Sequence, residues 1–328
     1  MKLQNELTIA KEAVRQASVL CASVQSSLGS VVQLDKADKS PVTVADYGAQ
    51  ALVLNILAAA FPEDPAVGEE DAGELRDPEN APLLSSIIEQ VQKVDSSLER
   101  NRILDSIDRG CHTGGPSGRF WTLDPIDGTK GFLRGDQYAV ALALIIDGEV
   151  VLGVLGCPNL TVDSDVSNPQ VGTILYAVKG QGAYRAPRSD LSRAFKITCD
   201  QVSDPALAVF CESVETGHTA HGWSKKITEL LGSKSKPFRI DSQCKYAAVS
   251  QGQASIYLRL PTRPGYEEKI WDHAAGYIIL MEAGGRISDT LGQPLDFSVG
   301  RTLRNNQGIV ATSSGVFDSV LQATIESA

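Results

Sequence analysis

The chain has 328 residues, with 40 acidic and 30 basic side chains that give a formal charge of −10. Hydrophobic residues make up 42% of the sequence and charged residues 21%, a balance that excludes a disordered chain. The acidic excess argues against a general nucleic-acid or membrane surface, because both attract net positive charge. Chains of this length usually divide their core, so we expect either two subdomains that share an interface or one large α/β body.

No segment has the pattern of a membrane span, a secretory signal or a metal-binding cysteine cluster. The longest uninterrupted apolar run covers residues 139–146, well short of the roughly 20 residues that a membrane helix needs. The segment Met1 to Leu7 contains no apolar signal core, so we expect a cytoplasmic protein that contacts no membrane. The six cysteines include no Cys-x-x-Cys pair, which favours buried reduced thiols and leaves disulfides or a metal as alternatives.

Two helices are predicted at the start of the chain. Apolar residues recur at helical spacing over residues 3–28, with charged residues between them. The same pattern over 46–60 predicts a second helix that ends before Pro62. A short apolar piece at 65–68 then leads directly into the acidic run 69–71.

The middle of the chain is predicted to form antiparallel hairpins. Residues 138–146 and 150–155 are apolar runs joined by a turn at Gly148, where glycine accepts a positive φ. A second hairpin is predicted from 173–178 and 183–186. These pairs indicate an antiparallel sheet.

The last third of the chain, after a polar stretch at 187–204, alternates between strand-like and helix-like segments. The strand-like segments are 206–210 and 254–260, and the helix-like segments are 223–231 and 272–283. Hairpins first and alternation later indicate an α+β domain over 1–195 joined to an α/β domain over 196–328.

The densest chemical signal is the segment 121–131, Trp-Thr-Leu-Asp-Pro-Ile-Asp-Gly-Thr-Lys-Gly. Apolar residues before Asp124 indicate a strand end, and the residues after Asp127 indicate a helix start. The two carboxylates can therefore face one point, together with helix-start amides that suit an anion. Carboxylate oxygens and a bound phosphate are the ligands that Mg²⁺ prefers. Alternatively, Asp127 caps the helix and Asp124 forms a turn.

Three further acidic sites have both a chemical and a structural interpretation. Glu69 and Glu70 follow the apolar segment 65–68, so they are expected at the end of a secondary-structure element. An acidic run of this kind is also typical of a solvated loop. Asp272 precedes a predicted helix and could be its N-cap. Asp46 would by default be an N-terminal helix residue. None of these sites decides between the two interpretations on its own.

In combination, these sites resemble the inositol-monophosphatase-like phosphatases, which depend on Mg²⁺ and are sensitive to lithium. Four motifs in order carry the resemblance: Lys36…Ser40-Pro-Val-Thr…Ala-Asp46, Gly68-Glu-Glu70, Asp124-Pro-Ile-Asp-Gly-Thr129 and Trp271-Asp-His-Ala-Ala-Gly276. Four longer segments are similar to the 3′(2′),5′-bisphosphate nucleotidase branch: 121–140, 212–218, 241–246 and 257–261. The resemblance covers nearly the whole chain.

The resemblance implies a layered αβαβα sandwich of the inositol monophosphatase and fructose-1,6-bisphosphatase type, with the active site where the halves meet. Asp46 and Thr129 would position and deprotonate the attacking water, and Glu70 would orient water bound to a metal. Two or three Mg²⁺ ions would be bound by Glu69, Asp124, Asp127, Asp272 and the carbonyl of Ile126. The residues implied in substrate binding are Gly128, Thr129, His218 (with His221 as the alternative imidazole), Asp241, Ser242, Lys245 and Arg259.

The physical chemistry of phosphoryl transfer agrees with this set. Two metal ions can bind both the attacking and the leaving oxygen, and the reaction needs positioning more than a nucleophilic side chain. Lys245 and Arg259 would by default be solvated or paired cations. In so acidic a protein, their convergence with His218 on one cleft would serve a second phosphate, which distinguishes a nucleotidase from an inositol monophosphate phosphatase.

The expected reaction is hydrolysis of adenosine 3′,5′-bisphosphate to AMP and phosphate, with 3′-phosphoadenosine 5′-phosphosulfate as a second substrate. The resemblance also implies links to sulfate assimilation and, through inhibition by Li⁺ or Na⁺, to salt tolerance. A monomer that binds no nucleic acid is expected. Two alternatives stay open: an inositol polyphosphate 1-phosphatase and a non-catalytic nucleotide or metal sensor.

Overall fold

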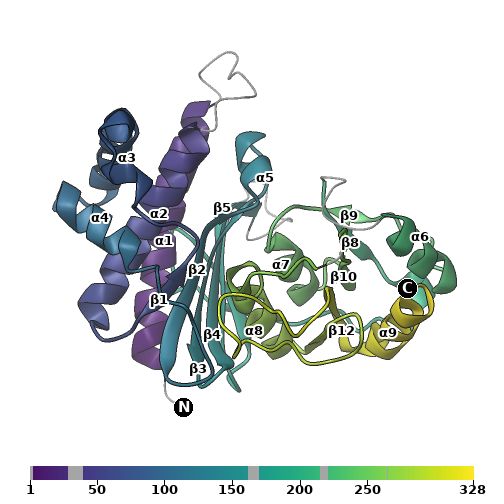
Figure 1. Cartoon of the computed structure of the whole chain (residues 1–328). Helices are drawn as coiled ribbons and strands as arrows, with labels where there is room; N and C mark the ends of the chain where they lie inside the picture. The colour runs from purple at the N-terminus through teal and green to yellow at the C-terminus, as the bar shows by residue number, and fades with distance from the viewer. Residues whose placement is uncertain (1–2, 29–39, 162–169, 215–220, 264) are drawn as a thin grey trace.

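The structure is a computed structural model whose elements form five layers, in the order helices, sheet, helices, sheet, helices (Figure 1). It describes residues 3–28, 40–161, 170–214, 221–263 and 265–328, without the side chains of residues 40–42 and 221. The layer order confirms the predicted αβαβα sandwich.

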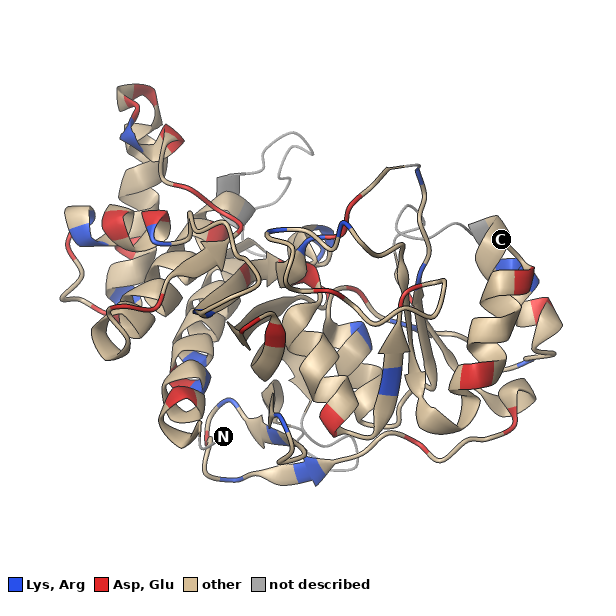
Figure 2. Ribbon diagram, turned by 60° about the horizontal axis from the view of Figure 1, so that its bottom comes forward, with Lys and Arg blue, Asp and Glu red and all other residues tan. Residues whose placement is uncertain are grey.

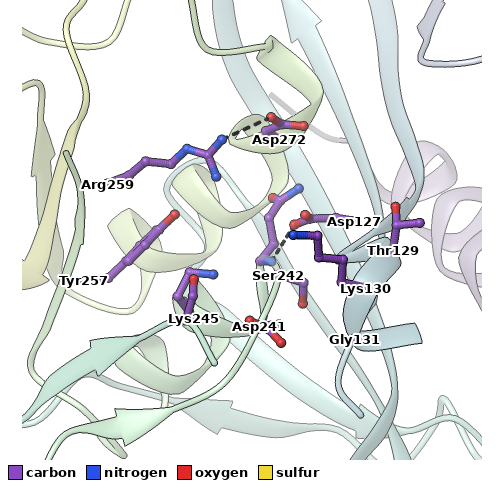
Figure 3. A pocket seen from close by; sticks show the side chains of 13 residues that line it. Asp127, Thr129, Lys130, Gly131, Asp241, Ser242, Lys245, Tyr257, Arg259 and Asp272 are labelled. Atoms are coloured by element: carbon purple, nitrogen blue, oxygen red, sulfur yellow. Dashed lines mark hydrogen bonds and ion pairs between the residues drawn. The ribbon is translucent and has the colours of Figure 1, made fainter. Parts of the chain in front are cut away.

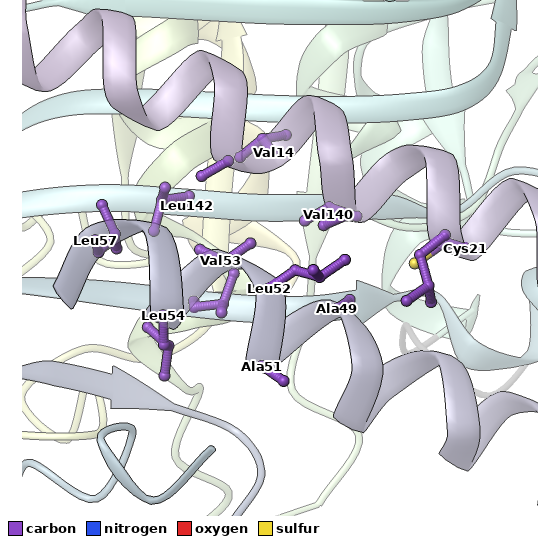
Figure 4. Packing of buried hydrophobic residues seen from close by; sticks show 14 of the residues in the cluster. Val14, Cys21, Ala49, Ala51, Leu52, Val53, Leu54, Leu57, Val140 and Leu142 are labelled. Carbon is purple, nitrogen blue, oxygen red and sulfur yellow. The ribbon is translucent and has the colours of Figure 1, made fainter. Parts of the chain in front are cut away.

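The first layer consists of helices that cover one face of the first sheet. α1 (Gln4–Leu28) and α2 (Ser40–Ala60) pack against each other, and α3 (Ala81–Val94) and α4 (Arg100–Asp108) lie against α2. α1 matches the predicted helix, whereas α2 begins at Ser40 rather than at Asp46. Figure 4 shows how side chains of α1 and α2 meet strand β3, among them Val14, Cys21, Leu52, Val53, Val140 and Leu142.

α2 is also the helix in the described part of the chain that has the length and composition to cross a membrane, over Thr43–Ala60. In the folded protein 67% of that stretch is buried, and α2 contacts α1, α3, α4 and β2. Its apolar character is therefore accounted for by its place inside the helix layer.

The first sheet has seven strands in sequence order. Its first two strands run parallel and each later pair is antiparallel. The strands are β1 (Ala66–Gly68), β2 (Arg119–Asp127), β3 (Ala139–Ile146), β4 (Glu149–Thr161), β5 (Val171–Val178), β6 (Ala183–Pro187) and β7 (Phe195–Ile197). The predicted hairpins correspond to β3–β4 and β5–β6, and Gly148 takes a φ of +78° in the first turn.

The second sheet lies beyond a middle layer of two helices. α7 (Cys244–Ser250) contacts the second sheet, and α8 (Ala274–Glu282) packs on β4 and β5 of the first. The strand order is β11-β12-β10-β8-β9. These strands are β8 (Phe210–Glu212), β9 (Phe238–Arg239), β10 (Ile256–Arg259), β11 (Gly285–Ser288) and β12 (Ile309–Ser313), with α6 (His221–Leu230) and α9 (Phe317–Glu326) outside them (Figure 1).

The predictions and the structure differ most where the chain passes between the sheets. The predicted strand at 206–210 is instead a 3-10 turn, Pro205–Leu207, which the Asp204 side chain begins by accepting a hydrogen bond from the N–H of Ala206. The strand β8 follows only at Phe210. The first sheet thus ends at Ile197 and the second begins at Phe210, and a division into two domains at residue 195 stays a prediction.

All six cysteines are free thiols. Five of them are buried, as expected, but Cys111 is exposed. The exception has a local cause, because Cys111 lies at the surface where the chain after α4 forms a single bridge with Val67 of β1.

Candidate active site

A break in the pairing of β2 brings its two aspartates together at the end of the strand. β2 pairs with β3 through Asp124 and again through Asp127, with a shift of register between them. Pro125 and Ile126 fall within this shift, which has the form of a β-bulge. Pro125 has no N–H to donate, and neither Pro125 nor Ile126 has a paired residue in β3.

Gly128 turns the chain from β2 into the short helix α5 (Thr129–Leu133). Its φ of +93° lies in the left-handed region, where a residue with a Cβ atom is strained. A Cβ atom here would also lie 2.8 Å from the Cβ of Ser242. Glycine therefore allows the turn after β2 to touch the turn that leads into α7.

Glu69 and Asp272 reach the same place from two other elements. β1 runs parallel to β2 with Gly68 opposite Leu123, so Glu69 follows beside Asp124. Asp272 ends a 3-10 turn just before α8, and this turn contacts both β2 and β3. The acidic residues that the sequence singled out thus come from separate segments to one edge of the first sheet.

Electrostatic effects show how closely these carboxylates converge. Burial, followed by the charges of Glu70 and Glu69, raises the pKa of Asp46 well above its ordinary value. Neighbouring like charges disfavour one another's ionisation, and bound cations would offset this effect. Burial also raises the pKa of Asp124 well above its ordinary value, and four nearby carboxylates raise it further: Glu69, Asp127, Asp272 and Asp46.

Two carboxyl groups at the edge of the cluster have pKa values near neutrality. The surrounding protein displaces water from the carboxyl of Glu69, and with the charges of Glu70 and Asp127 this raises its pKa to about 7, although the residue keeps exposed surface. Burial and the charge of Asp127 raise the pKa of Asp272 to about 7. The ionisation of the cluster therefore changes within the physiological pH range.

The donor set fits hard divalent cations. Asp46 Oδ1 and Asp124 Oδ1 are buried and have no hydrogen-bond partner among the described residues. Unpaired buried oxygens are costly, and a cation beside them would remove that cost. The other donors, from Glu69, Asp127 and Asp272, are also carboxylate oxygens, which Mg²⁺ prefers. The cluster therefore fits Mg²⁺.

The structure contradicts the helix-cap interpretations of these aspartates. The carboxylate of Asp127 accepts a hydrogen bond from the backbone N–H of Gln243, and Gly128 rather than Asp127 takes the cap position of α5. The residue at the cap of α8 is His273, so Asp272 does not cap that helix. Asp46 lies inside α2 rather than in its first turn.

Two carboxylates of the cluster, Asp127 and Asp272, line a cavity of about 280 Å³ that is also lined by the cationic residues Lys130, Lys245 and Arg259. Lys245 of α7 is buried and lies 5.3 Å from the centre of the Tyr257 ring. Burial lowers the pKa of Lys245, and the charge of Asp127 opposes this effect. Figure 3 shows Lys245, Tyr257 and Arg259 facing Asp127 and Thr129 across the cavity. Elsewhere acidic and basic residues are interspersed over the helices and loops of both halves (Figure 2).

Asp241 and Ser242 line the same cavity. The carboxylate of Asp241 pairs with Arg134 and accepts a hydrogen bond of 3.0 Å from the backbone N–H of Val214. Ser242 has a φ of +65°, which residues other than glycine rarely adopt, and its hydroxyl accepts a hydrogen bond from the N–H of Cys244. Asp241 is thus held by protein groups, whereas Ser242 begins the turn that carries Lys245.

Gln243 joins three segments of the site, although it is not among the site residues predicted from the sequence. Its backbone N–H donates to Asp127, and its side-chain Nε2 donates to the carbonyl of Trp271 at 2.9 Å. Its Oε1 accepts a hydrogen bond of 3.0 Å from the N–H of Gly276. The only signal was its place inside the motif 241–246. Other unpredicted residues that line the cavity or contact its walls are Lys130, Ser213, Tyr257, Glu268 and His273.

Some residues of the predicted motifs lie outside the described residues. These are Lys36, in the range 29–39, and Glu215, Thr216, Gly217 and His218, in the range 215–220. His221 begins α6, but its side chain is not described either. The choice between the two imidazoles therefore stays a prediction.

Comparison with known proteins shows the family of the chain. The inositol monophosphatase family matches residues 2–327, so the chain belongs to this family. A 3′(2′),5′-bisphosphate nucleotidase of Oryza sativa is 47% identical over 334 residues, which cover 97% of this chain and 93% of that protein. One of Schizosaccharomyces pombe is 44% identical over 340 residues, which cover 99% and 96%. The structure of an IMPase from Thermotoga maritima, 20% identical, shares the fold with a TM-score of 0.63 over 98% of both chains.

These comparisons confirm the resemblance that the four motifs indicated, and the shared fold confirms the layered sandwich. Members of this family depend on metal ions, and the acidic cluster offers suitable ligands. The number of ions and the roles of individual residues stay predictions.

Proposed function

We propose that this protein is a Mg²⁺-dependent 3′(2′),5′-bisphosphate nucleotidase that converts adenosine 3′,5′-bisphosphate to AMP and phosphate. The observation that carries the proposal is that one cavity has a carboxylate wall, Asp127 and Asp272, and a cationic wall, Lys245 and Arg259. The two walls meet where Nη2 of Arg259 lies 4.0 Å from Oδ2 of Asp272 (Figure 3). A substrate with two phosphates complements both walls, one through cations held by carboxylates and the other through direct ion pairs. The nucleotidase relatives support this class of substrate.

The acidic cluster is proposed to hold two or three Mg²⁺ ions. Bound Mg²⁺ would neutralise charge on the scissile phosphate and lower the pKa of water. The unpaired buried oxygens and the raised pKa values of the cluster support this assignment. The proposed ligands are the side chains of Glu69, Asp124, Asp127 and Asp272 and the carbonyl of Ile126.

Asp46 and Thr129 are proposed to position the attacking water and to take its proton. Asp46 approaches the cluster from α2, and Thr129 lies at the start of α5. Asp46 Oδ1 has no other partner among the described residues and can accept the proton that the threonine hydroxyl relays. Glu70 is proposed to orient water, and its backbone is fixed by Gln50, which donates to its carbonyl at 2.6 Å and accepts from its N–H at 3.2 Å.

The rest of the nucleotide is proposed to lie along the cationic wall. The backbone N–H groups of Gly128 and Thr129 would bind the scissile phosphate, since both residues line the cavity beside Asp127. Asp241 would act mainly by holding its turn, because Arg134 and Val214 already bind its carboxylate. The residues proposed to bind the sugar, the second phosphate and the base are His218, Ser242, Lys245 and Arg259.

The wider role proposed for the protein follows from its nucleotidase relatives and from the family resemblance. 3′-Phosphoadenosine 5′-phosphosulfate would be a second substrate, which would link the protein to sulfate assimilation. Inhibition by Li⁺ or Na⁺ would link it to salt tolerance. The protein is proposed to act as a cytoplasmic monomer that binds neither nucleic acid nor membranes.

The test is phosphate release from adenosine 3′,5′-bisphosphate and, in parallel, from inositol 1,4-bisphosphate, each with Mg²⁺, EDTA and Li⁺. We expect turnover of the nucleotide that requires Mg²⁺ and is inhibited by Li⁺. Turnover of the inositol compound alone would keep the metal site but contradict the roles of Lys245 and Arg259. No turnover of either compound would favour a non-catalytic sensor.

A further inference from the structure

Arg259 is held in place by a buried chain of polar groups. Its Nε lies 2.9 Å from Oε1 and 2.8 Å from Oε2 of Glu268, whose side chain is buried. Glu268 Oε2 in turn lies 3.3 Å from Nε2 of His273. The other ring nitrogen of His273 lies 2.9 Å from the hydroxyl of Tyr246. The chain runs from β10 through the turn before α8 to α7, so three elements fix one guanidinium group.

The same geometry determines which nitrogen atoms of Arg259 can still contact a ligand in the cavity. Because Nε is bound to Glu268, the terminal nitrogens of Arg259 are left for other partners. The side chain of Arg259 also forms a hydrogen bond with the side chain of Tyr266, and Nη2 lies 4.0 Å from Oδ2 of Asp272. Figure 3 shows the guanidinium group directed toward Asp272 at the rim of the cavity. An arginine without such support samples many rotamers, and ordering them on binding costs entropy.

Glu268, Asp272 and His273 could also be considered as a metal site, because one ligand atom of each lies within 4.8 Å of the others. Two observations argue against that interpretation. The carboxylate of Glu268 is already bound by Arg259 and His273. The positive charge of Arg259, next to both carboxylates, also disfavours a second cation at that position.

We propose that Glu268 is a positioning residue that orients Arg259 toward the second phosphate and so sets the preference for bisphosphates over monophosphates. This inference rests on the proposed nucleotidase function. The carboxylate wall would act on the scissile phosphate of any phosphate ester, whereas Arg259 belongs with Lys245 to the cationic wall, which meets the carboxylate wall at Asp272. Only a substrate with a second phosphate can use the orientation that Glu268 provides.

The experiment compares Glu268→Gln with wild type on adenosine 3′,5′-bisphosphate and on adenosine 3′-monophosphate. The glutamine keeps the size of the side chain but removes the charge that fixes Arg259. We expect KM for the bisphosphate to rise about tenfold. Values of kcat, KM for the monophosphate and half-saturation by Mg²⁺ should stay within about twofold of wild type.

The matched control is Glu267→Gln, which makes the same change one residue away. The carboxylate of Glu267 binds the hydroxyl of Thr302 at 2.6 Å and is exposed, so this variant should match wild type on both substrates. A combined Arg259→Ala and Glu268→Gln variant should show no further rise in KM beyond Arg259→Ala alone, because the two residues act as one unit.

Several results would overturn the inference. If KM rose equally for both substrates, or if the Mg²⁺ concentration for half-saturation rose strongly, Glu268 would be a metal ligand or a purely structural residue. Additive effects in the combined variant would also reject it. If Glu268→Gln does not fold, Tyr246→Phe removes only the hydroxyl that holds His273, and it should raise KM for the bisphosphate selectively. An unselective or absent effect of that variant contradicts the inference.

The wild-type data separate this inference from the proposed function. A wild-type enzyme that does not prefer the bisphosphate rejects the proposed nucleotidase function itself. If the wild-type enzyme prefers the bisphosphate but Glu268→Gln changes KM equally for both substrates, only the role of Glu268 is rejected.

Discussion

Asp46 combines two properties that are seldom found together in a folded protein. Its side chain is buried, and its Oδ1 has no hydrogen-bond partner among the described residues. Burial and two neighbouring glutamates raise its pKa, so the charged form is unfavourable unless cations are close. A buried carboxyl group with an unpaired oxygen and a raised pKa destabilises the fold. It is typical of a residue whose function is proton transfer.

Replacing Asp46 with asparagine should abolish turnover while leaving nucleotide binding intact. The amide cannot accept a proton, so kcat should fall by a factor of at least about 100. Calorimetric titration with AMP in the presence of Mg²⁺ should give a dissociation constant close to that of wild type. Asp105→Asn, at an exposed position of α4, is the matched control. Parallel loss of AMP binding would contradict the proposed role.

The pKa values of Glu69 and Asp272 predict how metal-free stability depends on pH. Both values are about 7 in the folded protein, above the ordinary values of 4.5 and 3.8. The folded state therefore keeps these protons to higher pH than the unfolded state does. As the pH rises from about 4 to about 7, the metal-free protein loses stability, and the loss is complete above pH 7.

Mg²⁺ should consequently stabilise the protein more at about pH 8 than at about pH 5.5, because the ions bind only ionised carboxylates. Differential scanning fluorimetry with Mg²⁺ or EDTA at both pH values measures this difference. K⁺ at matched ionic strength is the control. An equal increase in Tm at both pH values, or none at either, would count against a metal site built from these residues.

At the level of secondary structure, Arg301 connects the two segments that carry Glu69 and Asp272. Its Nη2 donates to the carbonyl of Gly68 at 2.6 Å, and Nη1 donates to the carbonyl of His112 at 2.9 Å. The guanidinium carbon lies 4.8 Å from the centre of the Trp271 ring. One side chain thus links the end of β1 to the turn before α8.

Replacing Arg301 with methionine should lower the free energy of unfolding by roughly 2–4 kcal/mol, because it leaves backbone carbonyls without donors. It should also raise the Mg²⁺ concentration needed for half-maximal activity. Denaturant unfolding and a Mg²⁺ titration measure the two effects. Arg304→Met, at an exposed position nearby, is the control, and equal effects of both variants would show that Arg301 has no special role.

Helix α1, which has one apolar face, and the buried apolar run of β3 were predictable from the sequence, whereas helix α7 was not. α1 shows a clear helical pattern and was predicted at nearly its observed length. Every residue of α7 is buried, so its segment, Cys244–Ser250, has no polar face to reveal a helix. The strand predicted at 206–210 was wrong because Pro205 and the Asp204 cap begin a 3-10 turn there.

At the scale of the whole molecule, the site lies where the edge of the first sheet meets the helices that support the second (Figure 1). The acidic residues were predictable because they occur in short motifs around chain turns. The residues that hold them in place were not, since their partners are remote: Gln243 binds Asp127 across 116 positions and Arg301 binds Gly68 across 233. Only the folded chain reveals such contacts.

We propose that the 3′-phosphate binds at the carboxylate wall and the 5′-phosphate at the wall of Lys245 and Arg259. The most direct test is to identify the nucleotide product formed from adenosine 3′,5′-bisphosphate with Mg²⁺, by phosphorus NMR against both adenosine monophosphates. We expect adenosine 5′-monophosphate and inorganic phosphate in equal amounts. Adenosine 3′-monophosphate as the product would contradict the assignment of the two walls.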